Sequence, residues 1–264
     1  MGHNFFSVWP LLFIFPGFWN LTDAQPKDMI GIEQRTFMPF YSSTDDSVKV
    51  ESFYMDIHPV TNAEFLDFVK ASPEWRRSQV KSVFAEEGYL QHWAGDLDLG
   101  PDAEEIKDSP VTNVSWFAAR AYAKWKGKRL PTLYEWELAA SASKNKPIAS
   151  RDKEFVKQIL DWYSRPNPEV LPSVGQHEPN YYGLHDMHGL IWEWVQDFNT
   201  VFISGESRAD QGELKQFFCA AGSSAASDSD KENYAAFLRY AFRGSLEADF
   251  PVGTLGFRCA KDKK

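Results

Sequence analysis

Apolar side chains recur at helical spacing in three stretches of this 264-residue chain, and each stretch follows a residue that can cap a helix. The caps are Thr61 with Glu64, Ser115, and Thr132 with Glu135, two of them in the capping-box pattern. A glycine at position 127 is placed to end the second helix. We expect a fourth helix over residues 153–160, followed by a proline-rich crossing.

Residues 51–58 alternate between apolar and polar well enough to predict a strand, which leads into the first helix through Pro59. Residues 71–109 are polar and acidic with scattered tryptophans, which predicts a long irregular excursion. Residues 181–197 combine aromatics, glycines and polar residues with neither helical nor strand periodicity. That stretch predicts compact irregular backbone held by buried tryptophans.

Composition favours a loop-rich fold with a large aromatic core. The chain is 43% apolar and 16% aromatic, with 16 Gly and 15 Pro. Its net charge of −9 and pI near 5.2 argue against a nucleic-acid surface or an anionic membrane surface as partner.

The N-terminal segment has the pattern of a secretory signal. Residues 5–19 are apolar but broken by prolines, and small residues follow at Thr22 and Ala24. We therefore interpret residues 1–24 as a signal peptide, 25–50 as a lead-in and 51–264 as the folded domain. The mature protein is then expected to be periplasmic or secreted, with no membrane span.

The motifs, taken together and in order, resemble the formylglycine-generating enzyme family, also called the sulfatase-modifying factor family. The match runs from about Phe53 to Ala260, through segments that read VTN, PVTNVSW, GKRLPTLYEWE, YGLHDMHGLIWEW and GFR. The resemblance implies an α+β fold: a single compact, C-type-lectin-like domain with little regular secondary structure. Family members include copper-dependent oxidases that convert a sulfatase cysteine to formylglycine, iron enzymes that join sulfur to histidine derivatives, and relatives without catalysis.

The residues that bind copper in these oxidases are missing here. In the family, two cysteines between a Gly-Gly-Ser strand and the final Gly-Phe-Arg strand bind Cu(I), a soft ion that thiolates favour. The corresponding strand here is residues 219–223, and residues 224–246 contain no cysteine. We therefore expect no copper at a two-cysteine site. The candidate cleft would instead be lined by Ser223, Ser227, Asp228, Asp230, Arg239, Tyr240 and Arg243.

The chain has two cysteines, Cys219 and Cys259, both on strand-like segments. Where family members carry disulfide partners for the second cysteine, this chain has Ala123 and Ala140. Three alternatives stay open: a disulfide between the two, two buried thiols, or a metal site.

Calcium is the cofactor that the resemblance suggests, through Glu193 in the WEW segment, although Leu190 replaces an asparagine ligand of the family. His185 and His188 are spaced by three and are interpreted as turn or surface residues rather than as metal ligands with His58 or His177. For the Arg258 guanidinium we expect a buried ion pair with Glu193, Asp197 or Glu137.

Trp162, Tyr163 and Arg165 are placed either to line a groove for an extended peptide or to pack against the domain. The resulting functional hypothesis is a non-oxidase accessory or maturation factor that binds an exported peptide or partner protein. Two alternatives remain: a metal-dependent oxidase or other protein-modifying enzyme with a rebuilt site, and a lectin-like binding domain.

Overall fold

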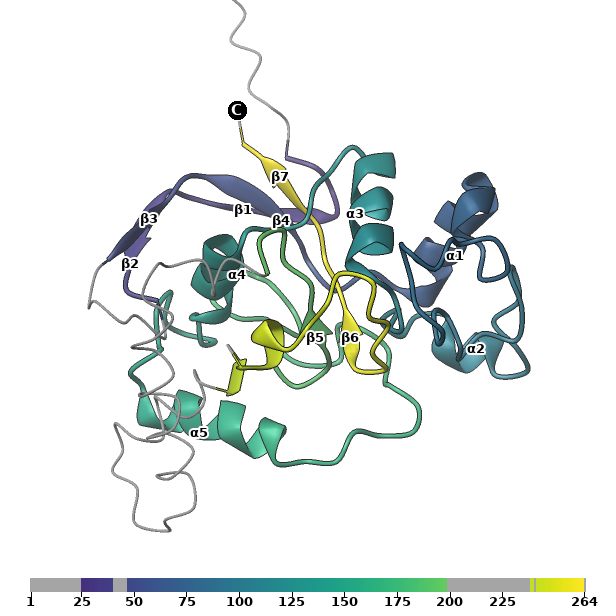
Figure 1. The fold of residues 1–264 in the computed structure, drawn as a ribbon. Helices are drawn as coiled ribbons and strands as arrows, with labels where there is room; N and C mark the ends of the chain where they lie inside the picture. The colour runs from purple at the N-terminus through teal and green to yellow at the C-terminus, as the bar shows by residue number, and fades with distance from the viewer. Residues whose placement is uncertain (1–24, 40–46, 199–237, 240, 264) are drawn as a thin grey trace, which may run out of the picture.

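Three short strands from distant parts of the chain form the main sheet of the computed structural model (Figure 1). They are β1 (Met29–Ile32), β4 (Phe53–Asp56) and β7 (Ala260–Asp262), in the order β1-β4-β7 and antiparallel throughout. The structure describes residues 25–39, 47–198, 238–239 and 241–263. Because β4 is the central strand, the sheet joins both ends of the described chain.

Two smaller strand pairs complete the regular β structure of the described residues. β2 (Arg35–Phe37) pairs antiparallel with β3 (Val48–Val50), and β5 (Trp192–Glu193) runs parallel to β6 (Leu255–Gly256). The strands β1, β2 and β3 lie in the segment expected to be a lead-in. The folded domain therefore begins well before residue 51, because β1 provides an edge of the main sheet.

The predicted helices α1 (Asn62–Ala71), α3 (Trp116–Trp125) and α4 (Leu133–Ala140) are confirmed with their caps. Both capping boxes are formed, at Thr61 with Glu64 and at Thr132 with Glu135. In Figure 1, α1 and α3 lie to the right of the main sheet, and α4 lies to its left.

The fourth helix, α5 (Lys153–Tyr163), is longer than the sequence suggested. Asp152 caps it by accepting from the backbone N–H of Glu154 and Phe155. It continues through Trp162 and Tyr163, which the sequence analysis placed beside a proline-rich crossing, and ends before Pro166, where a following proline disfavours helical backbone. Both aromatic residues are therefore presented from a helix.

The two segments predicted to be irregular are irregular. Residues 71–109 hold only a 3-10 turn at Pro73–Trp75 and the four-residue helix α2 (Ala103–Ile106). In the 181–197 stretch, Gly183, Asp186 and Gly189 have positive φ values of 91°, 55° and 97°. The backbone there changes direction too often for a regular element, and only β5 forms at its end.

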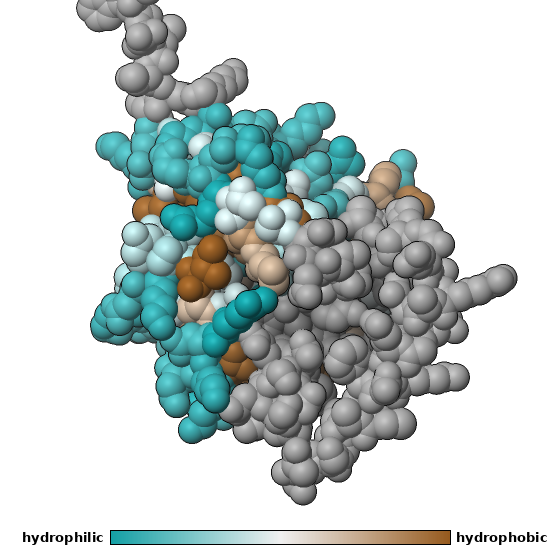
Figure 2. Space-filling model, turned by 90° about the vertical axis from the view of Figure 1, so that its left-hand side faces the viewer, coloured by the Kyte–Doolittle hydropathy of each residue, from teal (hydrophilic) through white to brown (hydrophobic). Residues whose placement is uncertain are grey.

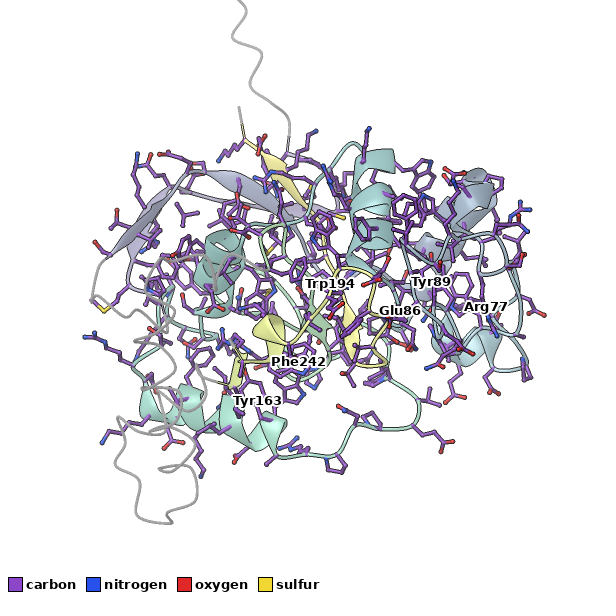
Figure 3. The ribbon with its side chains drawn as sticks, viewed as in Figure 1. Arg77, Glu86, Tyr89, Tyr163, Trp194 and Phe242 are labelled. Carbon is purple, nitrogen blue, oxygen red and sulfur yellow. The ribbon has the colours of Figure 1, made fainter. Side chains whose placement is uncertain are left out.

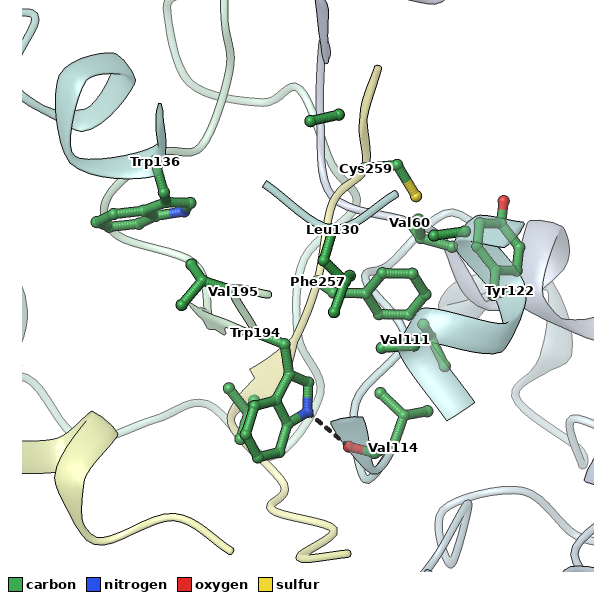
Figure 4. Close-up of a cluster of buried hydrophobic side chains, with 14 of the residues drawn as sticks. Val60, Val111, Val114, Tyr122, Leu130, Trp136, Trp194, Val195, Phe257 and Cys259 are labelled. Carbon is green, nitrogen blue, oxygen red and sulfur yellow. Dashed lines mark hydrogen bonds between the residues drawn. The ribbon is translucent and has the colours of Figure 1, made fainter. Parts of the chain in front are cut away.

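The core fills the space between α1, α3 and the last strands (Figure 4). The Phe257 ring contacts the Phe65 and Tyr122 rings edge-on, at centroid distances of 6.1 and 5.3 Å. The Trp194 indole is fully buried and donates from Nε1 to the Val114 carbonyl at 2.9 Å. The tryptophan pinning expected for the irregular stretch is confirmed at Trp194.

Among the described residues, no helix has the length and apolar character needed to cross a membrane.

Gly256, on β6, is packed too tightly for any side chain. A Cβ there would lie 2.3 Å from the Val111 carbonyl oxygen, a backbone atom that cannot move aside cheaply. We expect Gly256→Ala to lower the free energy of unfolding by about 3 kcal/mol. Gly253→Ala is the matched control, because its Cβ would meet the Asn113 side chain at an ordinary 3.7 Å. Urea unfolding of both variants measures the difference, and equal stabilities would contradict this packing.

Candidate functional site

The Glu193 carboxylate is buried at the junction of β5 and the last strands, and a single guanidinium neutralises it. Arg258 donates from Nε to both carboxylate oxygens, at 3.0 and 2.9 Å, and from Nη2 to Oε1 at 2.8 Å. The Trp136 indole Nε1 donates to Oε2 at 2.7 Å. Of the three carboxylates considered for Arg258, the structure selects Glu193.

Arg258 also donates to backbone carbonyls from three parts of the chain. Its Nη2 donates to the His185 carbonyl at 2.9 Å, and its Nη1 lies 3.3 Å from the carbonyls of both Asp56 and Ile57. One side chain thus joins the irregular 181–197 stretch, the end of β4 and the segment that enters β7. Because the guanidinium is fully buried, each of these contacts is protected from water.

A second buried carboxylate, Glu137 on α4, forms ion pairs with two guanidiniums. Arg239 Nη1 lies 2.8 Å from Oε2, and Arg243 Nη1 lies 2.6 Å from Oε1. Both guanidiniums also stand over the Trp136 ring, at 5.4 and 4.6 Å from its centroid. The two arginines expected in the cleft are therefore brought together, and their visible role is to attach the residues before β6 to α4.

An aromatic stack lies next to these ion pairs. Trp192 is sandwiched between Tyr163 and Phe242, with ring centroids 5.0 and 4.6 Å away and interplanar angles of 21° and 27°. Trp162 contacts the same indole at 5.5 Å. All four rings are half-buried, and Figure 3 shows Tyr163 and Phe242 close together beside α5.

Of the groove residues expected from the sequence, Trp162 and Tyr163 belong to this stack, whereas Arg165 is exposed just beyond the end of α5. The Tyr163 hydroxyl is buried and has no hydrogen-bond partner among the residues that the structure describes. Trp192 and Phe242, which complete the stack, were not singled out from the sequence as groove residues. Their aromatic character was the available signal, but their pairing depends on the fold.

His188 is packed among aromatic rings and positive charges. Its ring contacts Trp136, Phe155 and Trp162, at centroid distances of 6.2, 5.6 and 6.5 Å. Nε2 lies 2.8 Å from the Ala140 carbonyl, whereas Nδ1 is buried and has no partner within the described ranges of the chain. Burial, with further repulsion from nearby arginines, lowers the pKa of His188 to about 3. The ring is therefore neutral, with Nε2 carrying the proton.

His177 and His185 make hydrogen bonds to nearby parts of the chain. His177 Nδ1 pairs with the buried Asp186 carboxylate at 2.9 Å, and His185 Nδ1 lies 2.7 Å from the His177 carbonyl. The described residues contain no group of three or more His, Cys, Asp or Glu side chains placed to hold a metal.

Cys259 is a free thiol and is fully buried. Burial and the nearby Asp56 carboxylate raise its pKa well above the usual range, so the reactive thiolate is disfavoured. Its predicted partner, Cys219, lies outside the described residues. Of the open alternatives, the structure shows Cys259 as a buried thiol and not in a disulfide.

The Glu193 side chain does not fit the predicted role of calcium ligand. Both oxygens already accept from Arg258, and a calcium ion in their place would stand against a buried guanidinium. Calcium binding elsewhere stays a prediction. The remaining cleft residues, Ser223, Ser227, Asp228, Asp230 and Tyr240, lie outside the described residues, as does the predicted strand 219–223.

Comparison with known proteins identifies the family to which this fold belongs. The family described as the sulfatase-modifying factor enzyme 1-like domain matches residues 12–263. The chain belongs to this family. Its motif order and its α+β fold are those of the formylglycine-generating enzymes, as the sequence analysis expected.

Individual relatives differ in activity. The chain is 29% identical to the formylglycine-generating enzyme of Streptomyces coelicolor, over 82% of this chain and 80% of the relative. It is 27% identical to the inactive C-alpha-formylglycine-generating enzyme 2 of Bos taurus, over 74% of this chain and 79% of that protein. Similarity thus extends to active and inactive members, and the family alone leaves the activity open.

A third relative is larger. The chain is 32% identical to the serine/threonine-protein kinase Pkn1 of Chlamydia caviae, over 81% of this chain but only 34% of the kinase. It therefore spans about one third of the length of that relative. Among solved structures, PvdO from Pseudomonas aeruginosa aligns over 90% of this chain and 96% of its own, with 18% identity and a TM-score of 0.48.

The Arg258–Glu193 pair gives a test by double substitution. Arg258→Met leaves a buried carboxylate without its charge partner, so we expect a loss of about 3–5 kcal/mol in the free energy of unfolding. The double variant Arg258→Met, Glu193→Gln also removes the negative charge of Glu193. We expect it to recover at least about 1 kcal/mol of that loss, which is the usual size of the coupling energy between side chains in contact. Urea unfolding of the single and double variants measures this. Strictly additive losses would show that the two side chains do not interact.

His188 predicts a pH dependence of stability. Its pKa is about 3 in the fold and about 6.5 in the unfolded chain, so between these values only the unfolded chain binds the proton. Stability therefore falls as pH falls below 6.5, by up to about 1.4 kcal/mol per pH unit from this group. His188→Gln keeps a donor for the Ala140 carbonyl but cannot titrate. Unfolding measured from pH 7 to 5 should show a shallower slope in this variant, and an unchanged slope would contradict the assignment.

Proposed function

We propose that this domain is a non-oxidase accessory or maturation factor, which binds a peptide or a partner protein outside the cytoplasm. The proposal rests on where the chain has cysteines and where it has none. Residues 224–246 contain no cysteine, and Cys259 is buried in the core with a raised pKa. The two-thiolate copper site of the family's oxidases therefore has no counterpart among these residues.

The residues of the candidate cleft that the structure describes support binding rather than chemistry. Arg239 and Arg243 are held by the Glu137 carboxylate at 2.8 and 2.6 Å, as structural ion pairs. His188, with a pKa of about 3, is too weak a base to take protons at neutral pH. Neither the arginines nor this histidine has the usual features of a group that transfers protons.

The aromatic stack supports a binding role. Tyr163, Trp192 and Phe242 are half-buried, and their rings are already ordered by mutual stacking. Such rings lose little conformational entropy when a ligand covers them, and aromatic and arginine side chains supply much of the energy in peptide interfaces. An extended segment of an exported protein that crosses α5 near Arg165 would meet this stack first.

The proposal is tested with copper and a substrate peptide together. The purified chain is titrated anaerobically with Cu(I) against a chromophoric chelator, then mixed with oxygen and a cysteine-containing sulfatase-type peptide. We expect no stoichiometric Cu(I) binding and no aldehyde in the peptide by mass spectrometry. The Streptomyces coelicolor relative is the positive control.

Either of two results would contradict the proposal. One is a copper ion held per chain with conversion of the cysteine. The other is peptide modification supported by a different metal, which would favour the alternative of an enzyme with a rebuilt site.

A further inference from the structure

The outward face of α3 carries aromatic rings and positive charges that are partly or fully exposed. The buried side of the helix consists of Ala118, Ala119, Tyr122 and Ala123. On the other side Phe117, Arg120, Ala121, Lys124 and Trp125 follow at i, i+3, i+4, i+7 and i+8, and none of them is buried. This second stripe extends for two turns, about 12 Å.

A neighbouring loop continues the apolar part of this face. Phe84 is 40% exposed and packs edge-on against Phe117, with ring centroids 5.4 Å apart, and Val83 beside it is 65% exposed. Trp125, at the other end of the stripe, is 43% exposed. We call Val83, Phe84, Phe117, Arg120, Lys124 and Trp125 the α3 face.

The α3 face is positively charged in an otherwise acidic protein. Between Asp108 and Glu135 the sequence contains five Lys or Arg residues and no Asp or Glu. Two of the five, Lys128 and Arg129, are used in ion pairs with Asp28, Asp56, Glu135 and Asp262. Arg120, Lys124 and Lys126 are exposed and form no contact ion pair with a carboxylate within the described part of the chain, although Lys126 lies near enough to Asp28 to lower the pKa of that carboxyl.

The cations and the rings form one surface. The Arg120 guanidinium stands 5.2 Å from the Trp116 ring centroid, and Lys126 Nζ stands 5.1 Å from that of Trp125. A ligand that covers the rings would therefore also meet the positive charges. A complementary ligand needs apolar side chains at helical spacing with carboxylates beside them.

We propose that the α3 face is a docking site for an acidic amphipathic segment of a partner protein. This inference goes beyond the proposed function, because it concerns a surface separate from the stack around Trp192. The side of the molecule seen in Figure 2, at the left of Figure 1, is away from α1 and α3, and its described surface is mostly hydrophilic with only small apolar groups.

A peptide fits this surface better than an anionic membrane. The rings are held by packing on their neighbours: Trp125 contacts Phe68 and Tyr122, at 5.7 and 5.9 Å, and does not stand free to insert into lipid. The exposed carboxylates of Glu86 and Glu87 follow directly after the Phe84 loop and would be repelled by anionic headgroups.

The test uses a labelled, capped helical peptide with Leu, Phe and Leu at i, i+4 and i+7 and glutamates on its flanks, titrated into the full chain by fluorescence anisotropy. We expect saturable binding that weakens as salt is raised. A peptide in which lysines replace the glutamates should bind at least about tenfold more weakly, because its charges face Arg120 and Lys124.

Protein variants locate the site. Lys124→Glu and Trp125→Ala should each weaken binding by about tenfold. Lys157→Glu is the charge-matched control, on an exposed position of α5, and should bind as the wild type does. Tyr163→Ala, in the aromatic stack, should also leave binding unchanged, which separates this site from the one in the proposed function. Thermal unfolding of each variant confirms that these surface changes keep the fold.

Four outcomes would overturn the proposal: no saturable binding of the acidic peptide, equal binding of the lysine peptide, binding that survives both α3 substitutions, or tighter association with anionic phosphatidylserine vesicles than with the peptide. The copper experiment is independent of all four, so failure here would leave the proposed function standing.

Discussion

The buried pair of Glu193 and Arg258 is the contact on which the rest of this structure depends. The described part of the domain has few regular elements, and the irregular 181–197 stretch places the buried side chains of Glu193 and Trp194. A fully buried guanidinium is costly unless all its donors are used. Here Arg258 donates to Glu193 and to three backbone carbonyls at once, so the charge that must be neutralised also links three segments of backbone.

The same pair explains how the aromatic residues are arranged. Trp136 donates to Glu193 from one edge and receives two guanidiniums over its face. Those guanidiniums are attached to α4 through Glu137, and the helical turn that carries them also presents Phe242 to Trp192. The ion pairs therefore help to hold the aromatic stack in place, and the binding surface proposed there depends on interactions that also stabilise an irregular fold.

The contacts that hold this domain together do not depend on cysteine. The contacts that maintain the domain involve Glu193, Arg258, Glu137 and Trp136, none of which is a cysteine. The absence of cysteine from residues 224–246 therefore removes none of these contacts. The α3 face is separate from these contacts, so the proposed docking there does not involve the ion pairs of Glu193 and Glu137.

Much of the fold could be predicted from the sequence because its signals are local. Thr61, Ser115 and Thr132 cap helices through contacts within three residues, and the caps formed as expected. The length of α5 and the strands before residue 51 could not be predicted, because they depend on long-range pairing such as β1 with β4.

Less of the candidate site could be predicted from the sequence. The charge partners of Arg258 could be narrowed to three carboxylates, but the choice of Glu193 over Asp197 and Glu137 depends on the three-dimensional path of the 181–197 stretch. The stack of Tyr163, Trp192 and Phe242 joins residues about eighty positions apart, and no periodicity links them.

A crystal structure of the protein grown in millimolar calcium would test the central role of this pair most directly. The account predicts the Arg258 guanidinium against both Glu193 oxygens, the Trp136 indole on Oε2, and no cation within the 2.3–2.6 Å range of calcium ligands around that carboxylate. A calcium ion coordinated by Glu193, with Arg258 displaced, would contradict it.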